Sequence, residues 1–269
     1  MPVVQRIATL AIVFTIIGLR PVAAQIDYRN LDDHRPVRTE DAYPIERYAF
    51  ELVAPYEYEN GRAGEQLHVV APELSYGAFA NTQVGLRLPL AALHTTAGTD
   101  WGFAGPRLFG LYNFNTEGPA LPALALRADL ALPTGDLGPD ATQLTLKALA
   151  TRSWGRTRLH LNAAGTLGRA AGRAAVDAEP RWALSLAADQ TFYRQSVLLI
   201  GELGVLEAAS EAPTDVSAAL GIRYQLTPTL VLDAGVSRRL TARAGPDLGL
   251  TLGLTHAFAF AGWLPGASR

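Results

Sequence analysis

Apolar and small or polar residues alternate with a period of two along most of the chain from Pro44 onward. The stretch LGLTLGLTHAF, from Leu248 to Phe258, is the clearest case: leucines take every second position up to Leu254, with Gly or Thr between them. A period of two is typical of a β-strand, whose successive side chains point to opposite faces. Such stretches recur at the spacing of roughly ten-residue barrel strands joined by turns, and they predict about twelve strands. These lie near residues 45–58, 65–76, 81–92, 101–115, 121–133, 142–154, 156–168, 181–192, 195–207, 215–225, 229–240 and 247–260.

The two faces of each predicted strand differ in a consistent way. In the stretch 121–133, Leu124, Leu126 and Leu130 share one face, whereas Arg127 and Asp129 share the other. One face is almost uniformly apolar, and the other mixes Gly, Ala, Ser and Thr with charges. A soluble barrel with an apolar core and a membrane barrel with an apolar exterior both fit this alternation, so the period alone does not separate them.

The connections and the aromatic residues favour the membrane barrel. Short connections (78–80, 154–156, 193–194, 226–228) alternate with long ones (93–99, 133–141, 169–180, 208–215, 241–247), and 115–120 is a longer exception. Outer-membrane barrels have short periplasmic turns and longer outer loops, with aromatic girdles at both membrane interfaces. Aromatic residues gather beside the short connections, and a smaller set, including Trp101 and Trp182, stands at the other rim. We therefore predict an all-β fold, a closed antiparallel transmembrane β-barrel over residues 44–260, with its last strand paired to its first. A secreted soluble β-sandwich is the alternative fold.

Composition adds limits on compartment and partners. The chain has 269 residues, 49% hydrophobic and 18% charged, with no cysteine and a formal net charge of −2. The absence of cysteine excludes disulfides and thiolate metal sites, and the charge argues against a nucleic-acid partner. Residues 1–24 have the basic start, apolar run and small-residue end of a cleaved signal peptide, and losing Arg6 and Arg20 with it shifts the charge to −4. We expect a bacterial outer-membrane location, with the lipid bilayer and a small solute as partners.

Two terminal segments flank the predicted barrel. Residues 25–43 form a charged, turn-rich N-terminal arm, and residues 261–269 form a C-terminal tail. The composition of the arm favours a flexible periplasmic segment. The alternative is a plug folded into the lumen, as internal plugs do in other barrels.

The arm and the first strand carry a family resemblance. Arg29-Asn30-Leu31-Asp32-Asp33, Arg35-Pro36, Glu40-Asp41-Ala42-Tyr43-Pro44, Arg47-Tyr48 and Phe50-Glu51 resemble outer-membrane barrels of the phenol-degradation meta-pathway transporter family. The resemblance is sharpest across residues 27–58. It implies an outer-membrane barrel that passes small, partly hydrophobic compounds, and it implies no binding residues.

Charged residues on the small-residue face are the candidate functional groups. The strands from 81 to 168 offer mainly cations, and the remaining strands offer mainly carboxylates, so a closed barrel would set a basic wall opposite a more acidic one. Opposed charges in a low-dielectric lumen create a field that orients polar solutes. The candidate constriction comprises Arg87, Arg107, Arg127, Lys147, Arg158, Glu51, Glu73, Asp189, Glu202 and Asp233. Alternatively, these residues pair with one another and fill the barrel. A buried charge has to be either paired or hydrated, and both interpretations meet this requirement.

The expected function is passage of small solutes, hydrophobic or aromatic ones among them, through the lumen or the wall. A closed structural or assembly barrel is an alternative. A lipid hydrolase is a weaker one, since His160 and Asn162 share a face and Ser185 would have to come from another strand. We expect no enzyme, no cofactor and no metal, and we expect His256 to be an interface residue.

Overall fold

The computed structural model describes residues 21–23, 26–61, 64–168, 179–192, 196–207, 214–241 and 246–264. Most of the predicted signal peptide, the end of the predicted tail and several long connections lie outside these residues. Pro21–Ala23, within the predicted signal peptide, form strand β1, which pairs with the end of β16. No helix among the described residues is long and apolar enough to cross a membrane.

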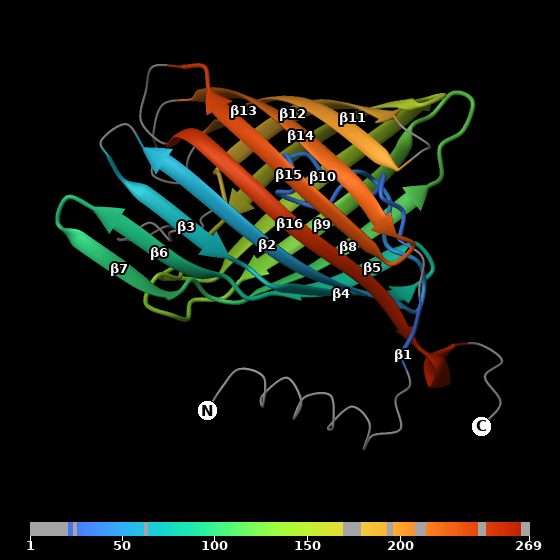
Figure 1. The fold of residues 1–269 in the computed structure, drawn as a ribbon, viewed down its shortest axis with the longest axis horizontal. Coiled ribbons are helices and arrows are strands. Elements are labelled where there is room, and N and C mark those ends of the chain that lie inside the picture. Colours follow the sequence, from blue (N-terminus) through green and yellow to red (C-terminus); the bar gives the residue numbers. More distant parts are fainter. Residues whose placement is uncertain are drawn as a thin grey trace.

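The wall is a closed antiparallel barrel of 12 strands, as the sequence predicted (Figure 1). Three of its strands are each divided into two segments: β3 (Gln66–Val70) with β4 (Glu73–Phe79), β5 (Thr82–Arg87) with β6 (Leu90–Thr95), and β7 (Gly98–Phe103) with β8 (Arg107–Asn115). The others are continuous: β2 (Ala49–Gly61), β9 (Ala123–Ala131), β10 (Gln143–Trp154), β11 (Thr157–Leu167), β12 (Trp182–Phe192), β13 (Val197–Glu207), β14 (Asp215–Thr227), β15 (Leu230–Arg239) and β16 (Pro246–Phe260). A one-turn 3₁₀ helix, Ala261–Trp263, follows β16.

Pairing of β16 with β2 closes the barrel, with Thr251 opposite Glu57 and Leu254 opposite Ala54. Closure satisfies the backbone groups that an open sheet would leave unpaired in lipid. The leucines of β16 point outward, and Leu252 is 54% exposed. The Gly and Thr positions of the same strand point inward. The apolar face of the alternating pattern is therefore the outer face, and the small and charged face lines the interior.

Prolines interrupt three neighbouring strands along one line. Pro72 lies between β3 and β4, Pro89 between β5 and β6, and Pro106 between β7 and β8. Proline has no N–H to donate to the ladder, so a strand tends to break or bend there. Beyond this line β7 pairs with β6 alone among the described strands, and β3, β6 and β7 lie together at one end of the barrel (Figure 1). The predicted long connection 93–99 is instead a tight turn between Thr95 and Gly98. The strands of the β6–β7 hairpin stay paired beyond the end of the alternating apolar pattern, so the connection is shorter than the pattern suggests.

The N-terminal arm, residues 26–48, runs inside the barrel as a hairpin, drawn in blue in Figure 1. It starts beside the turn after β14, where Ile26 N–H donates to Pro228 O, and ends beside β4, where Tyr48 N–H donates to Gly77 O. Its apex is a turn at Asp32–Arg35, with Arg35 N–H bonded to Asp32 O. The preference for a flexible periplasmic segment is corrected: composition records the charges of the arm, but it does not reveal that the barrel interior supplies their partners.

Candidate functional site: the arm-filled lumen

Apolar contacts fix the first limb of the arm. Ile26, Tyr28, Leu31 and Val37 are buried against inward-facing residues of β12–β16, in a cluster with Ala187, Leu198, Ile200, Ala219, Val231 and Ala257. At about 25 cal/mol per Å² of apolar surface, such burial is a substantial stabilising term for a short segment. The inner wall is thus apolar enough at this position to hold a peptide.

Two glycines of the wall make room for the arm at Pro36. A Cβ added to Gly235 would lie 1.9 Å from the carbonyl oxygen of Pro36, and one added to Gly221 would lie 2.6 Å from Pro36 Cγ. Thr251 Oγ1 also donates to Pro36 O at 2.9 Å. These small residues of the inner face are therefore the surface that receives the arm.

The basic wall meets the carboxylates of the arm. Arg127 Nη1 lies 2.8 Å from Glu40 Oε1, and Lys147 Nζ lies 2.5 Å from Asp33 Oδ2. Arg158 Nη1 lies 3.1 Å from Asp41 Oδ2. A buried charge is costly unless it is paired, so these contacts explain how cations of the wall are held away from bulk water.

The more acidic wall meets donors of the arm. Arg35 Nη1 donates to Asp233 Oδ2 at 2.8 Å. The backbone N–H of Thr39 donates to Glu202 Oε2 at 2.6 Å, and its Oγ1 donates to Ser185 Oγ at 2.7 Å. The arm is therefore complementary to both walls, with carboxylates toward the cations and donors toward the carboxylates.

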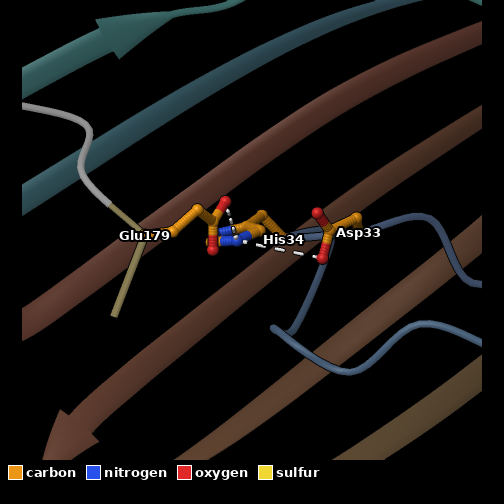
Figure 2. A group of neighbouring side chains, drawn as sticks. All are labelled: Asp33, His34 and Glu179. Carbon is orange, nitrogen blue, oxygen red and sulfur yellow. Dashed lines mark ion pairs between the residues drawn. The ribbon is translucent and has the colours of Figure 1, made fainter. Parts of the chain in front are cut away.

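The apex of the arm contacts the connection between β11 and β12. His34 Nε2 lies 3.5 Å from Glu179 Oε1 and 3.8 Å from Asp33 Oδ1 (Figure 2). We call these three residues the apex cluster. Their ligand-type atoms all lie within 4.8 Å of one another, which is compact enough for a metal ion. However, Lys147 already contacts Asp33, and Arg107 Nη1 contacts Glu179 Oε1 at 2.7 Å, so the carboxylates are neutralised and the cluster does not fit a divalent cation.

The electrostatics of the apex cluster follow from these contacts. Burial alone raises the pKa of Asp33, but Lys147, His34 and Arg127 outweigh it and hold that pKa below its ordinary value. Burial likewise raises the pKa of Glu179, and Lys147 and His34 lower it well below the usual range. Burial lowers the pKa of His34, and the two carboxylates more than offset this and raise it above 6.5. The cluster thus favours a charged His34 between two ionised carboxylates.

All ten residues of the predicted constriction face the interior. Nine are buried, and Glu73 is half-buried, with Ser75 Oγ donating to it at 3.0 Å. Arg87 pairs with Glu57 at 2.7 Å, and Arg158 Nη2 pairs with Asp189 at 2.6 Å. The structure brings Arg127 and Lys147 to one cluster on the arm, whereas Glu202 and Asp233 contact the other side of it. Whether the ten form a constriction for solutes remains a prediction.

The sequence identified the charged residues of the barrel wall, but it did not identify the residues that pair with them. Asp33, Arg35, Glu40 and Asp41 of the arm and Glu179 of a long connection complete the ion pairs, and none was among the candidates. The available signal was that the arm carries both signs of charge, as the inner faces of the strands do. That signal is too weak to choose between a plug and a tail.

The hydrolase candidates lie inside the barrel but do not form a Ser-His pair. His160 is 0% exposed; its Nε2 lies 2.9 Å from Asp189 Oδ2 and its Nδ1 lies 3.0 Å from Thr151 Oγ1. Ser185 Oγ is hydrogen-bonded to Thr39 instead. Thr151 Oγ1 also accepts the N–H of Ala42 at 3.0 Å. The chain Thr151–His160–Asp189 has the order of a catalytic relay, but the arm covers it.

Comparisons with known proteins support the fold. No protein-family model and no curated protein matches the chain. Its structure is similar to an outer membrane channel from Pseudomonas putida F1, with a TM-score of 0.63 and 15% identity over 85% of this chain and 100% of that one. It is also similar to the KdgM porin (TM-score 0.51, 13% identity, 77% and 98% covered) and to the NanC porin (0.52, 7%, 76% and 98%). At these identities the likeness shows a shared outer-membrane barrel fold, and it does not identify the phenol-degradation family.

Proposed function

We propose that this chain is a bacterial outer-membrane channel for small solutes, hydrophobic or aromatic ones among them, and that the arm closes it in this structure. One observation carries the proposal. Both ends of the arm lie at the same end of the barrel, at Pro228 and at Gly77, each beside a short turn. A hairpin inserted from one side can withdraw without threading through the barrel and without opening the wall. The plug is thus separable from the pore it fills.

The size and lining of the barrel support a pore behind the arm. Eight strands enclose only their own side chains and sixteen leave an aqueous channel, so a barrel of intermediate size fits a narrow pore. Apart from the apolar patch under the first limb of the arm, the inner face is mainly charged and polar, which suits water once the arm has left. Arg127, Lys147, Glu202 and Asp233 would then face each other across the lumen as the predicted constriction.

The line of prolines supports passage of partly hydrophobic solutes. Behind it lies a buried apolar cluster of Val69, Ala71, Ala91, Ala104 and Leu137. Leu137 belongs to the connection between β9 and β10, and its N–H donates to Phe103 O on β7. Since β7 has no second strand partner among the described strands, this connection covers the edge of the wall there. Displacement of the connection would give a solute with an apolar body a sideways route toward lipid.

The alternative is a closed structural barrel, which the density of ion pairs around the arm favours. The proposal contains no catalytic step. The two readings differ in whether the arm has to move, and a reversible crosslink tests this. The natural chain has no cysteine, and the hydroxyl oxygens of Thr39 and Ser185 lie 2.7 Å apart, so the double variant Thr39→Cys/Ser185→Cys should form a disulfide between arm and wall.

The measurement is single-channel conductance of the refolded protein in planar bilayers, oxidised and reduced. We expect openings that disappear on oxidation and return on reduction. Liposome swelling in arabinose gives the same comparison for an uncharged solute.

The matched control is Thr145→Cys/Thr166→Cys, which joins two adjacent wall strands at a site where the hydroxyls are 2.9 Å apart. The conductance of this variant should not change on oxidation. Undiminished conductance from a fully crosslinked arm would show that the arm is not the gate. Silence of the folded, reduced and wild-type proteins would favour the structural barrel.

A further inference from the structure

A cavity lies between the apex of the arm, at Asp33 and His34, and the connection between β11 and β12, at Glu179 and Pro180. This connection is one of the long ones, so the cavity faces the end of the barrel that outer-membrane topology places outside the cell. The cavity is small, with a volume of about 20 Å³, and it opens to solvent on one side. By the measure of one water per ~10–15 Å³, a cavity of this size holds one small functional group.

Two side chains in the cavity lack partners. Arg38 is half-buried, and its guanidinium makes no hydrogen bond or ion pair with any residue in the described part of the chain. Asn162 is 8% exposed, and its Oδ1 is buried with no hydrogen-bond partner among the described residues. Buried polar groups are nearly always satisfied, so the Asn162 oxygen calls for a hydrogen-bond donor, which a water in the cavity would supply.

The charge around the cavity favours an anion. Asp33 and Glu179 also line it, but Lys147 and Arg107 neutralise them at 2.5 and 2.7 Å. Arg38 remains as an uncompensated cation. The lowered pKa values of both carboxyl groups agree with a positive surrounding, since burial alone would raise them.

We infer that this cavity binds the carboxylate of a small organic acid that arrives from the long-loop end, with the Arg38 guanidinium as the donor. Guanidinium presents paired N–H donors that match a carboxylate. The positive charge of Arg38, together with that of His34, suits an anion, and the two nearby carboxylates disfavour a dianion. The open mouth takes the body of the solute. The inference deepens the proposed channel function, on which it rests, by naming the polar end of a solute.

The test is equilibrium binding by the full refolded protein in detergent, measured by calorimetry. The probes are benzoate and benzamide, which have nearly the same shape but differ in charge. We expect benzoate to bind and benzamide not to bind. Arg38→Gln should weaken benzoate binding by about tenfold or more, the scale of one charge-assisted hydrogen bond. Arg38→Lys, which keeps the charge, should retain part of the affinity.

Arg238→Gln is the matched control, because Arg238 is exposed on β15; this variant should bind benzoate like the wild type. Equal benzoate affinity of Arg38→Gln and wild type, or equal binding of benzamide and benzoate, would overturn the assignment. A wild-type protein that conducts ions but binds no benzoate would overturn this inference and leave the channel. A wild-type protein that binds benzoate through Arg38 but never conducts ions would support the binding site and overturn the proposed channel function.

Discussion

At the scale of single residues, the interior is organised by charge complementarity between two parts of one chain. Arg127 contacts Glu40 of the arm and Asp129 of its own strand, each at 2.8 Å. Arg35 of the arm contacts Asp233 of the wall. Removing one member of a buried pair costs about 3–5 kcal/mol, because the other charge stays buried without compensation. The arm therefore neutralises charges of the barrel that would otherwise require water.

At Gly235 the arm backbone lies where a Cβ would be, and Gly235→Ala should displace the arm. The added methyl group would overlap the carbonyl oxygen of Pro36, which belongs to backbone and has no rotamer to adopt. We expect larger or more frequent channel openings and faster proteolysis of the arm, with the heat-modifiable gel migration of the barrel retained. Gly165→Ala is the control, since nothing lies within 4 Å of its added Cβ. A Gly235→Ala protein with wild-type conductance and a protected arm would contradict the prediction.

At the scale of elements, the hairpin of the arm is held at its apex as well as along its limbs. The apex cluster joins the turn Asp32–Arg35 to the connection before β12 through His34 and Glu179. His34 has a positive φ of 63°, a conformation that histidine and asparagine tolerate better than most residues. This makes His34→Asn a suitable substitution for removing the charge without straining the turn.

The apex cluster should make docking of the arm dependent on pH. The pKa of His34 is raised above 6.5, so its contribution is fully present below pH 6.5 and is lost as the pH rises through the raised value. The pKa values of Asp33 and Glu179 are lowered from 3.8 and 4.5, so their contribution is present above those values and is lost only in stronger acid. Docking is therefore strongest in mildly acidic solution and weakens toward alkaline pH.

The measurement is the rate at which a maleimide labels a cysteine introduced as Thr39→Cys, with and without His34→Asn. The ratio of the two rates cancels the ionisation of the thiol. At pH 6 we expect labelling to be roughly fivefold faster in the His34→Asn background, which corresponds to about 1 kcal/mol for a partly exposed pair. At pH 9 the ratio should approach one. His256→Asn, on the outer face, should give a ratio of one at both pH values, and a pH-independent ratio for His34→Asn would refute the role of its charge.

At the scale of the whole molecule, the arm sets the charge of the lumen. Residues 26–41 contain five carboxylates and three arginines, a net charge of −2. Withdrawing them leaves the cations of β8–β11 without several of their partners. The open barrel is therefore more positive along this wall than the closed one.

Deletion of residues 26–41 should shift ion selectivity toward anions, as read from reversal potentials in a salt gradient. In that background, Arg127→Ala with Lys147→Ala should reduce the anion preference, because both cations then face the lumen unpaired. Arg238→Ala should leave the reversal potential unchanged. If the double substitution has no effect in the arm-deleted protein, these two residues do not belong to the constriction.

The sequence by itself determined the barrel, and only the tertiary structure decided what fills it. A two-residue period places Leu248, Leu250 and Leu252 on one face whatever the partners are, and its recurrence over about twelve strands leaves closure as the way to pair every backbone group. The arm has no such period. Its path depends on contacts between residues far apart in sequence, such as Thr39 with Glu202 and Asp33 with Lys147, and composition cannot tell a charge that is solvated from one that is paired. Pro72, Pro89 and Pro106 lie inside the predicted strands 65–76, 81–92 and 101–115, and the structure divides each strand at its proline. That the three prolines lie on one line across the wall follows only from the register of the folded sheet.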